Sequence, residues 1–194
     1  NKMAVTAQQI IDRARLQLAD PNATRWADAE LINYLNDGQR EVVLYKPDAS
    51  SANTDVALVA GSKQTMPSDS IRLVSVVRNT HSKYKRAVRA VPRETLDRFR
   101  PNWHDDKQAT EVQHFIFDEN DQNVFYVFPP NDGSGQVEVM YTQTPTEVSQ
   151  LSDNLGVSDG YANAVLDYVL YRAFSKDADI PSSAQRANGY YQGL

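Results

Sequence analysis

The order of its segments constrains this chain most. Two amphipathic helical segments lie between residues 6 and 46, a long strand-rich stretch follows, and a helical period returns from Ser158. An amphipathic helix must bury its apolar stripe against another element, and neither helical end offers enough partners by itself. We therefore predict an α+β fold. A helical bundle of about four helices from both termini, residues 1–50 and 155–194, would carry an inserted, mainly antiparallel β domain over residues 55–147.

Spacing and caps define the first two helices. Thr6-x-x-Gln9 is a capping-box pattern before a helix that Asp20-Pro21 should end. Asp28 and Glu30 suit the start of a second helix. The tripeptide Asn36-Asp37-Gly38 resembles a hairpin turn, but its flanks have a helical period. We predict one continuous helix with Gly38 as a close-packing or weak point, and a buried stripe of Leu31, Leu35, Val42 and Tyr45.

The closing helical region has two parts. A wide apolar face predicts a helix over Ala162–Ala178, and Asp179-Ile180-Pro181 should break it. Ser182-x-x-Gln185 is a second capping-box pattern and predicts a last helix that reaches Tyr190-Tyr191.

The middle of the chain predicts strands joined by short polar loops, which is typical of antiparallel meanders. Asp48–Thr54 reads as a polar linker, and Gly61-Ser62 as the turn of a hairpin. Pro129-Pro130 and Thr144-Pro145 should end the last strands. We expect a short helix over Pro92–Phe99 and strands over Val56–Val59, Lys63–Met66, Ile71–Arg78, Ala87–Val91, Val112–Phe117, Val124–Phe128 and Val137–Tyr141.

Composition excludes several classes of site. The chain has no cysteine, which rules out disulfides, thiolate nucleophiles and cysteine-bound zinc. No apolar run approaches the roughly 18–20 residues of a membrane span, so we expect no membrane contact. No signal-peptide core precedes the first helix, and we expect synthesis in the host cytoplasm.

Catalytic and metal-binding patterns are weak. The histidines are scattered, and Trp103-His104-Asp105-Asp106 reads as a solvated loop anchored by its tryptophan. Asp118-x-Asn120 resembles a calcium loop, but Asn123 stands where the glycine belongs, which favours a hairpin loop. We predict no catalytic residue, no metal, no cofactor and no enzymatic activity. A hydrolase site built from dispersed residues stays as a remote alternative.

Charge is distributed unevenly. The segment Arg72–Arg100 holds nine of the twenty Lys and Arg residues but only two acids, so it is +7 and the remainder is −12. Such a segment suits a nucleic-acid surface, a face that docks on the acidic face of an identical neighbour, or a solvated strand edge. Lys83-Tyr84-Lys85-Arg86 interleaves an aromatic ring with cations, as in single-strand binders. The low overall pI, about 5.2, argues against tight duplex binding.

Two runs, Arg25–Glu41 and Leu166–Ala178, resemble phage adaptor proteins that join the head portal to the tail. Two shorter similar runs, Phe125–Pro130 and Arg186–Tyr191, occur in the same order, so the resemblance covers most of the chain. The layout is similar to the tail tubular protein A type of short-tailed phages. The basic segment contains no motif of that family that we can match.

The resemblance implies a virion protein, a head-tail connector in an oligomeric ring at the head-to-tail junction. It implies a dodecamer, a ring of twelve identical subunits, which binds the portal protein above and a downstream tail or nozzle protein below. During DNA ejection, genomic DNA would pass through its lumen without tight or specific binding. The alternative function is a DNA-contacting accessory protein that uses residues 72–100.

Two sets of residues are candidates for contacts. For the C-terminal set, a tail packed on its own helical domain is at least as good an interpretation as insertion into the portal. Subunit-interface candidates are Arg78, Lys85, Arg86, Arg89, Arg93 and Arg98; portal-docking candidates are Arg186, Tyr190 and Tyr191.

Overall fold

The computed structural model describes residues 4–176 and 181–193, and the chain divides into two compact units. A helical unit combines residues 1–50 with residues 145–194, and a β unit spans Ser51–Thr144. Within the described residues, helices and two mainly antiparallel sheets make an α+β fold, as predicted.

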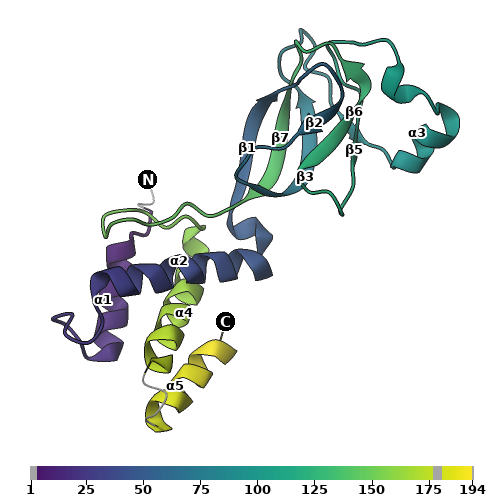
Figure 1. Cartoon of the computed structure of the whole chain (residues 1–194). Helices are drawn as coiled ribbons and strands as arrows, with labels where there is room; N and C mark the ends of the chain where they lie inside the picture. Colours follow the sequence, from purple (N-terminus) through teal and green to yellow (C-terminus); the bar gives the residue numbers. More distant parts are fainter. Residues whose placement is uncertain (1–3, 177–180, 194) are drawn as a thin grey trace. The chain divides into compact units, whose positions relative to one another are not determined.

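The helical unit contains α1 (Ala7–Leu18), α2 (Asp28–Tyr45), α4 (Ala162–Ser175) and α5 (Pro181–Gln192). Short 3₁₀ turns, η1 (Pro47–Ala49) and η3 (Asp159–Tyr161), follow α2 and precede α4. Helix α4 packs against α1 and α2, and α5 packs against α4 (Figure 1). Both ends of the chain supply the core, since Ile10, Leu35 and Val169 are fully buried in one cluster.

Local sequence signals explain the first two helices. The hydroxyl of Thr6 accepts the amide N–H of Gln9, and the Gln9 side chain accepts the amide N–H of Thr6, which confirms the capping box. Helix α2 runs unbroken through the Asn36–Gly38 tripeptide. A Cβ at Gly38 would lie 3.1 Å from Cδ1 of Tyr168 on α4. Gly38 is therefore a close-packing point between α2 and α4.

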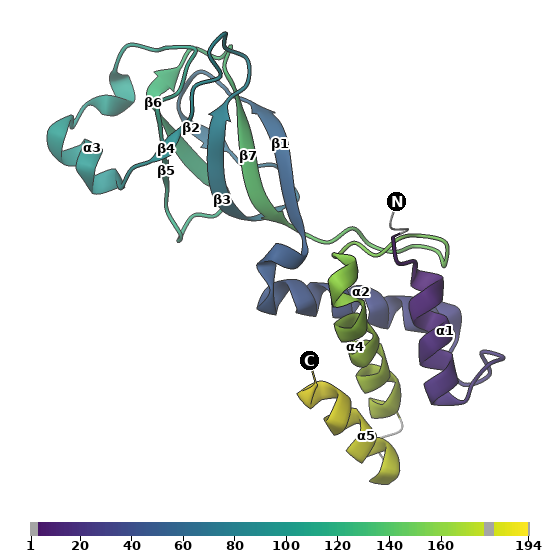
Figure 2. The ribbon, with the colours of Figure 1, turned by 180° about the vertical axis from the view of Figure 1, so that it is seen from behind.

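The β unit is built from two sheets around one apolar core. Strands β1 (Ser51–Ala57), β7 (Gln136–Gln143) and β3 (Ser70–Asn79) lie in that order in the first sheet (Figure 2). The second sheet has the order β2 (Gly61–Thr65), β6 (Val124–Asn131), β5 (His114–Phe117) and β4 (Arg89–Ala90). Val139 and Val76 from the first sheet pack with Phe125 and Val127 from the second.

A smaller cluster lies beside the second sheet. Helix α3 (Arg93–Phe99) and the 3₁₀ turn η2 (Trp103–Asp105) supply Leu96 and Trp103, which pack with Ile116 of β5. Trp103 is fully buried and donates its indole N–H to Oδ1 of Asp97 at 2.9 Å. This bond ties the turn back to α3.

Two strand predictions are wrong, because strand pairing depends on distant partners. β1 begins at Ser51, inside the expected linker, and it pairs with β7 and not with β2. The expected hairpin about Gly61-Ser62 therefore does not form. Strand β4 is parallel to β5, since α3 and η2 provide the long crossover that a parallel pair needs.

Two boundary predictions are also wrong. Strand β6 continues through Pro129-Pro130, because these residues lie beyond the last pair with β5, His114 with Phe128, and no amide donor is required there. Helix α5 begins at Pro181, so Ser182 lies inside the helix and not at its N-cap. The expected break at Asp179 and Ile180 lies outside the described residues.

Candidate interaction surfaces

Two of the six predicted interface cations already have intramolecular partners. Nε of Arg78 on β3 lies 2.5 Å from Oε2 of Glu138 on β7. This bond lowers the pKa of Glu138 and raises that of Arg78. Nε of Arg93 lies 3.1 Å from Oδ2 of Asp97, one helical turn away on α3. Arg78 and Arg93 are thus less available to a second molecule than the sequence implied.

The other four, Lys85, Arg86, Arg89 and Arg98, are exposed. None of them forms an ion pair with a described carboxylate within 4 Å. Arg86 and Arg89 line a pocket together with His114. We call Lys85, Arg86 and Arg89 the basic rim. Guanidinium groups with free donors suit carboxylate or phosphate oxygens.

Asn79 fixes the backbone of the basic rim. Its side-chain amide is buried and donates to the carbonyl oxygens of Arg86 at 2.9 Å and of Val112 at 2.8 Å. Its Oδ1 accepts the amide N–H of Val112 at 2.8 Å. The end of β3 therefore holds the segment that presents Arg86 in one position.

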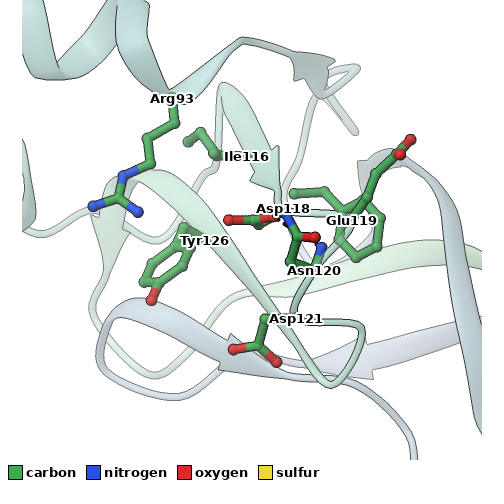
Figure 3. Close-up of a pocket in the computed structure, with 8 residues that line it drawn as sticks. Arg93, Ile116, Asp118, Glu119, Asn120, Asp121 and Tyr126 are labelled. Carbon is green, nitrogen blue, oxygen red and sulfur yellow. Dashed lines mark hydrogen bonds between the residues drawn. The ribbon is translucent and has the colours of Figure 1, made fainter.

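A second pocket lies by the loop between β5 and β6 (Figure 3). Arg93 and Tyr126 line one side of it, and the acidic loop from Asp118 to Asp121 lines the other. Oδ1 of Asp118 accepts the amide N–H of Asn120 at 2.9 Å, and this bond lowers the pKa of Asp118. The loop joins two antiparallel neighbours, which confirms the hairpin interpretation. Within residues 4–176 and 181–193, no group of three or more histidine or acidic side chains could hold a metal ion.

His104 packs against Trp103 and hydrogen-bonds to a serine. Its ring stacks on Trp103 with ring centroids 3.6 Å apart, and its Nδ1 lies 2.7 Å from the hydroxyl of Ser62. The indole of Trp103 lowers the pKa of Asp97 by hydrogen bonding to it. The prediction of a loop anchored by Trp103 is therefore confirmed.

The portal-docking candidates pack on their own helical unit. The ring of Tyr190 stacks on Phe174 of α4, and its hydroxyl donates to Oε1 of Gln17 on α1 at 2.5 Å. The guanidinium of Arg186 lies over the same Phe174 ring, 5.5 Å from its centroid. Tyr191 is half exposed beside Tyr171. This is the alternative that the sequence left open, and Tyr191 is the more exposed of the two tyrosines.

A protein-family model described as SU10 adaptor protein matches residues 5–194, nearly the whole chain. The chain belongs to the SU10 adaptor protein family. The match indicates a phage adaptor, a structural protein of the virion, and supports that part of the resemblance. Such a family is typically non-enzymatic. The more specific likeness to the tail tubular protein A type stays a hypothesis. No curated protein matches the chain.

The adaptor has a further pocket that the sequence did not reveal. Val42 and Tyr45 from the last turn of α2 line it with Tyr161 and Ala164 at the start of α4. Tyr45 was expected in the core, but it is 67% exposed because the apolar stripe of α2 runs past the helices that cover it. The only sequence signal was the consecutive pair Leu44-Tyr45 at the helix end. No helix of this adaptor, in its described parts, is long and apolar enough to cross a membrane.

Proposed function

We propose that this adaptor forms a ring beneath the portal and continues the DNA channel from the head into the tail. The observation behind the proposal is the family match over residues 5–194. Its partners are identical subunits, the portal protein and the next tail protein, and we propose twelve copies in the ring. We propose that the protein is located in the virion, at the junction of head and tail.

The charge distribution supports a closed ring of identical subunits. Each subunit of such a ring presents two different surfaces, one to each neighbour. We propose the basic rim as one such surface, because its cations have no ion-pair partner among the described residues and Asn79 fixes the backbone at Arg86. The acidic balance outside residues 72–100 supplies the complementary charge on the neighbour.

A net charge of −5 also suits a channel protein. Duplex DNA binds through many contacts between cations and phosphates, and each contact raises the affinity. An acidic protein whose cations are engaged between subunits lets DNA pass without holding it. In this arrangement the helical unit docks on the portal, and Arg186, Tyr190 and Tyr191 remain candidates for that contact.

The test of the basic rim is the double variant Arg86→Glu and Arg89→Glu. Both side chains are exposed, so we expect a folded monomer that no longer assembles, alone or on its portal. The matched control, Lys63→Glu with Lys107→Glu, makes the same charge change at exposed sites outside the segment. Mass photometry and circular dichroism measure assembly and folding. Intact rings in the double variant would reject the role of the rim.

Copurification tests the function itself. The tagged chain, isolated from infected cells, should recover portal and tail proteins, with the portal close to equimolar. Recovery of a soluble monomer without either protein would contradict the proposal. In that case a steep salt dependence of DNA binding, lost in the double variant, would favour the DNA-contacting alternative.

A further inference from the structure

Exposed apolar side chains of the helical unit gather in two places. In its described part, the large ones are Leu16, Leu44, Tyr45 and Tyr191. Tyr45 and Tyr191 line the pocket region at the end of α2, and Leu44 directly precedes Tyr45 in the last turn of that helix. The fourth, Leu16 on α1, is 81% exposed and stands apart from the others. The unit therefore carries an isolated apolar projection and, elsewhere, an apolar pocket.

The lining of the pocket is mostly apolar. Val42, Tyr45, Tyr161 and Ala164 give it mostly carbon walls. The hydroxyl of Tyr161 donates to Oδ2 of Asp48 at 3.1 Å, which holds that ring in place. Tyr191 of α5 lines the adjoining part of the same groove.

Leu16 cannot fill the pocket of its own chain. Its neighbour Arg15 reaches Asp28, the first residue of α2, with Nη2 to Oδ1 at 2.5 Å. The pocket is formed by the last turn of that helix, 14 to 17 residues further on. At 1.5 Å of rise per residue, the two sites are roughly 20–25 Å apart along α2. Figure 1 shows α1 and the last turn of α2 at different ends of this unit.

Charges around the two sites are complementary. Asp12 and Arg13 precede Leu16 by one helical turn, so they share its face of α1. Glu41 and Lys46 flank the pocket. Asp12 can face Lys46 of a second molecule while Arg13 faces Glu41. Arg13 uses one N–H on Asn163 of its own α4, at 3.0 Å, and retains other donors.

We infer that Leu16 of one copy inserts into the α2-end pocket of a second copy. A projection and a pocket on separate faces of one subunit make a head-to-tail contact, which closes into a ring when the rotation between copies allows it. The inference rests on the proposed ring and adds to it a second contact, in the helical unit, that is independent of the basic rim. An amphipathic portal segment is the competing occupant of the pocket.

Cysteine cross-linking tests this contact without background, because the natural chain has no cysteine. Leu16→Cys and Tyr45→Cys are placed in one chain, where their separation prevents an internal disulfide. Oxidation of assembled protein should give a ladder of covalent oligomers on a non-reducing gel. Each single variant should give monomer, and a mixture of the two single variants should give dimers that contain one of each.

A second variant measures the energy of the contact. Leu16→Glu should lower the assembled fraction roughly tenfold or more, the effect of losing one buried leucine. Val59→Glu, a matched change of an exposed aliphatic residue in the β unit, should leave assembly unchanged. Mass photometry measures the assembled fraction of both variants, alone and with the purified portal.

The outcomes separate this inference from the ring itself. Rings that form without cross-links between positions 16 and 45, or that persist in Leu16→Glu, overturn the contact and leave the proposed function standing. Cross-links of Leu16→Cys with itself overturn the head-to-tail arrangement. If the portal alone protects the cysteine of the Tyr45→Cys variant from a thiol reagent, the pocket belongs to the portal and the inference is overturned. If the wild type forms no ring even on its portal, both proposals fail.

Discussion

At the scale of single residues, Asp20 shows how one carboxylate organises a connection. Its two oxygens accept the amide N–H groups of Thr24 at 2.8 Å, Arg25 at 3.0 Å and Trp26 at 2.9 Å. Nη1 of Arg15 lies 3.5 Å from Oδ2. These bonds, the one from Trp26 above all, lower the pKa of Asp20. Asp20 thus fixes the turn that leads from α1 to α2.

Asp20→Asn should change how stability depends on pH. Because the folded-state pKa is below the unfolded one, the stabilisation is complete above about pH 4 and is lost as pH falls through the folded-state pKa. We expect wild type to lose more stability between pH 7 and pH 3 than the variant, which is already weaker at pH 7. Urea unfolding at both pH values measures this. Asp12→Asn is the control and should follow wild type, because the described hydrogen bond of the Asp12 carboxylate comes from the Gln8 side chain and not from backbone amides. Parallel pH profiles for Asp20→Asn and wild type would contradict the assignment.

At the scale of elements, the contact of α2 with α4 depends on the absent side chain of Gly38. A Cβ at Gly38 would lie only 3.1 Å from Cδ1 of Tyr168. Arg172 on the same helix α4 reaches Oδ2 of Asp37 at 3.1 Å and the Tyr168 hydroxyl at 3.1 Å. Burial raises the pKa of Tyr34, on the same α2, to about 12. Close packing and polar pairing therefore act together in this contact.

Gly38→Leu should destabilise the helical unit by about 1–3 kcal/mol, because the new side chain forces α2 and α4 apart despite its good helix propensity. Gly189→Ala on α5 is the matched control, since nothing lies within 4 Å of its Cβ position. That change should stabilise by about 0.5–1 kcal/mol. Urea unfolding monitored by circular dichroism gives both values. A stabilising effect of Gly38→Leu would show that the contact is looser than described.

At the scale of the whole molecule, the two units have separate cores. The β unit closes on itself, because Ser51 at its start pairs with Thr142 near its end. The helical unit cannot form from one end, since Leu31 and Leu35 of α2 pack in one cluster with Val165 and Leu170 of α4. The β unit is thus a self-contained insertion between the two halves of a helical core.

Residues 51–144 expressed alone should fold, and residues 1–50 alone should not, because burial of the α2 stripe requires α4. Near-ultraviolet circular dichroism and cooperative urea unfolding measure both outcomes. The buried Trp103 reports on the β unit by its fluorescence. An unfolded 51–144 fragment would mean that the helical unit supports the sheets, which would contradict separate cores.

Features that rest on neighbouring residues followed from the sequence. The Thr6 capping box, the unbroken helix through Gly38 and the short helix ending at Phe99 each depend on residues within a few positions, where helix period and capping chemistry act. The adaptor resemblance of Arg25–Glu41 was likewise readable, because those residues form one continuous helical run. The anchoring of the Trp103–Asp106 loop was also predictable, because a large apolar tryptophan side chain in a polar loop favours burial.

Only the tertiary structure decided which distant segments meet. β1 pairs with β7, from Ser51 with Thr142 to Ala57 with Gln136, while the nearby β2 belongs to the other sheet. The same holds for charges: Glu138, remote in sequence, engages Arg78, whereas Arg86 and Arg89 have no carboxylate partner among the described residues. The pocket at the end of α2 is lined by residues from both α2 and the start of α4. The hydrophobic period of a helix or strand is a property of consecutive residues. Strand pairing and pocket formation depend instead on the relative free energies of contacts between distant segments. No local pattern in a single sequence encodes those free energies.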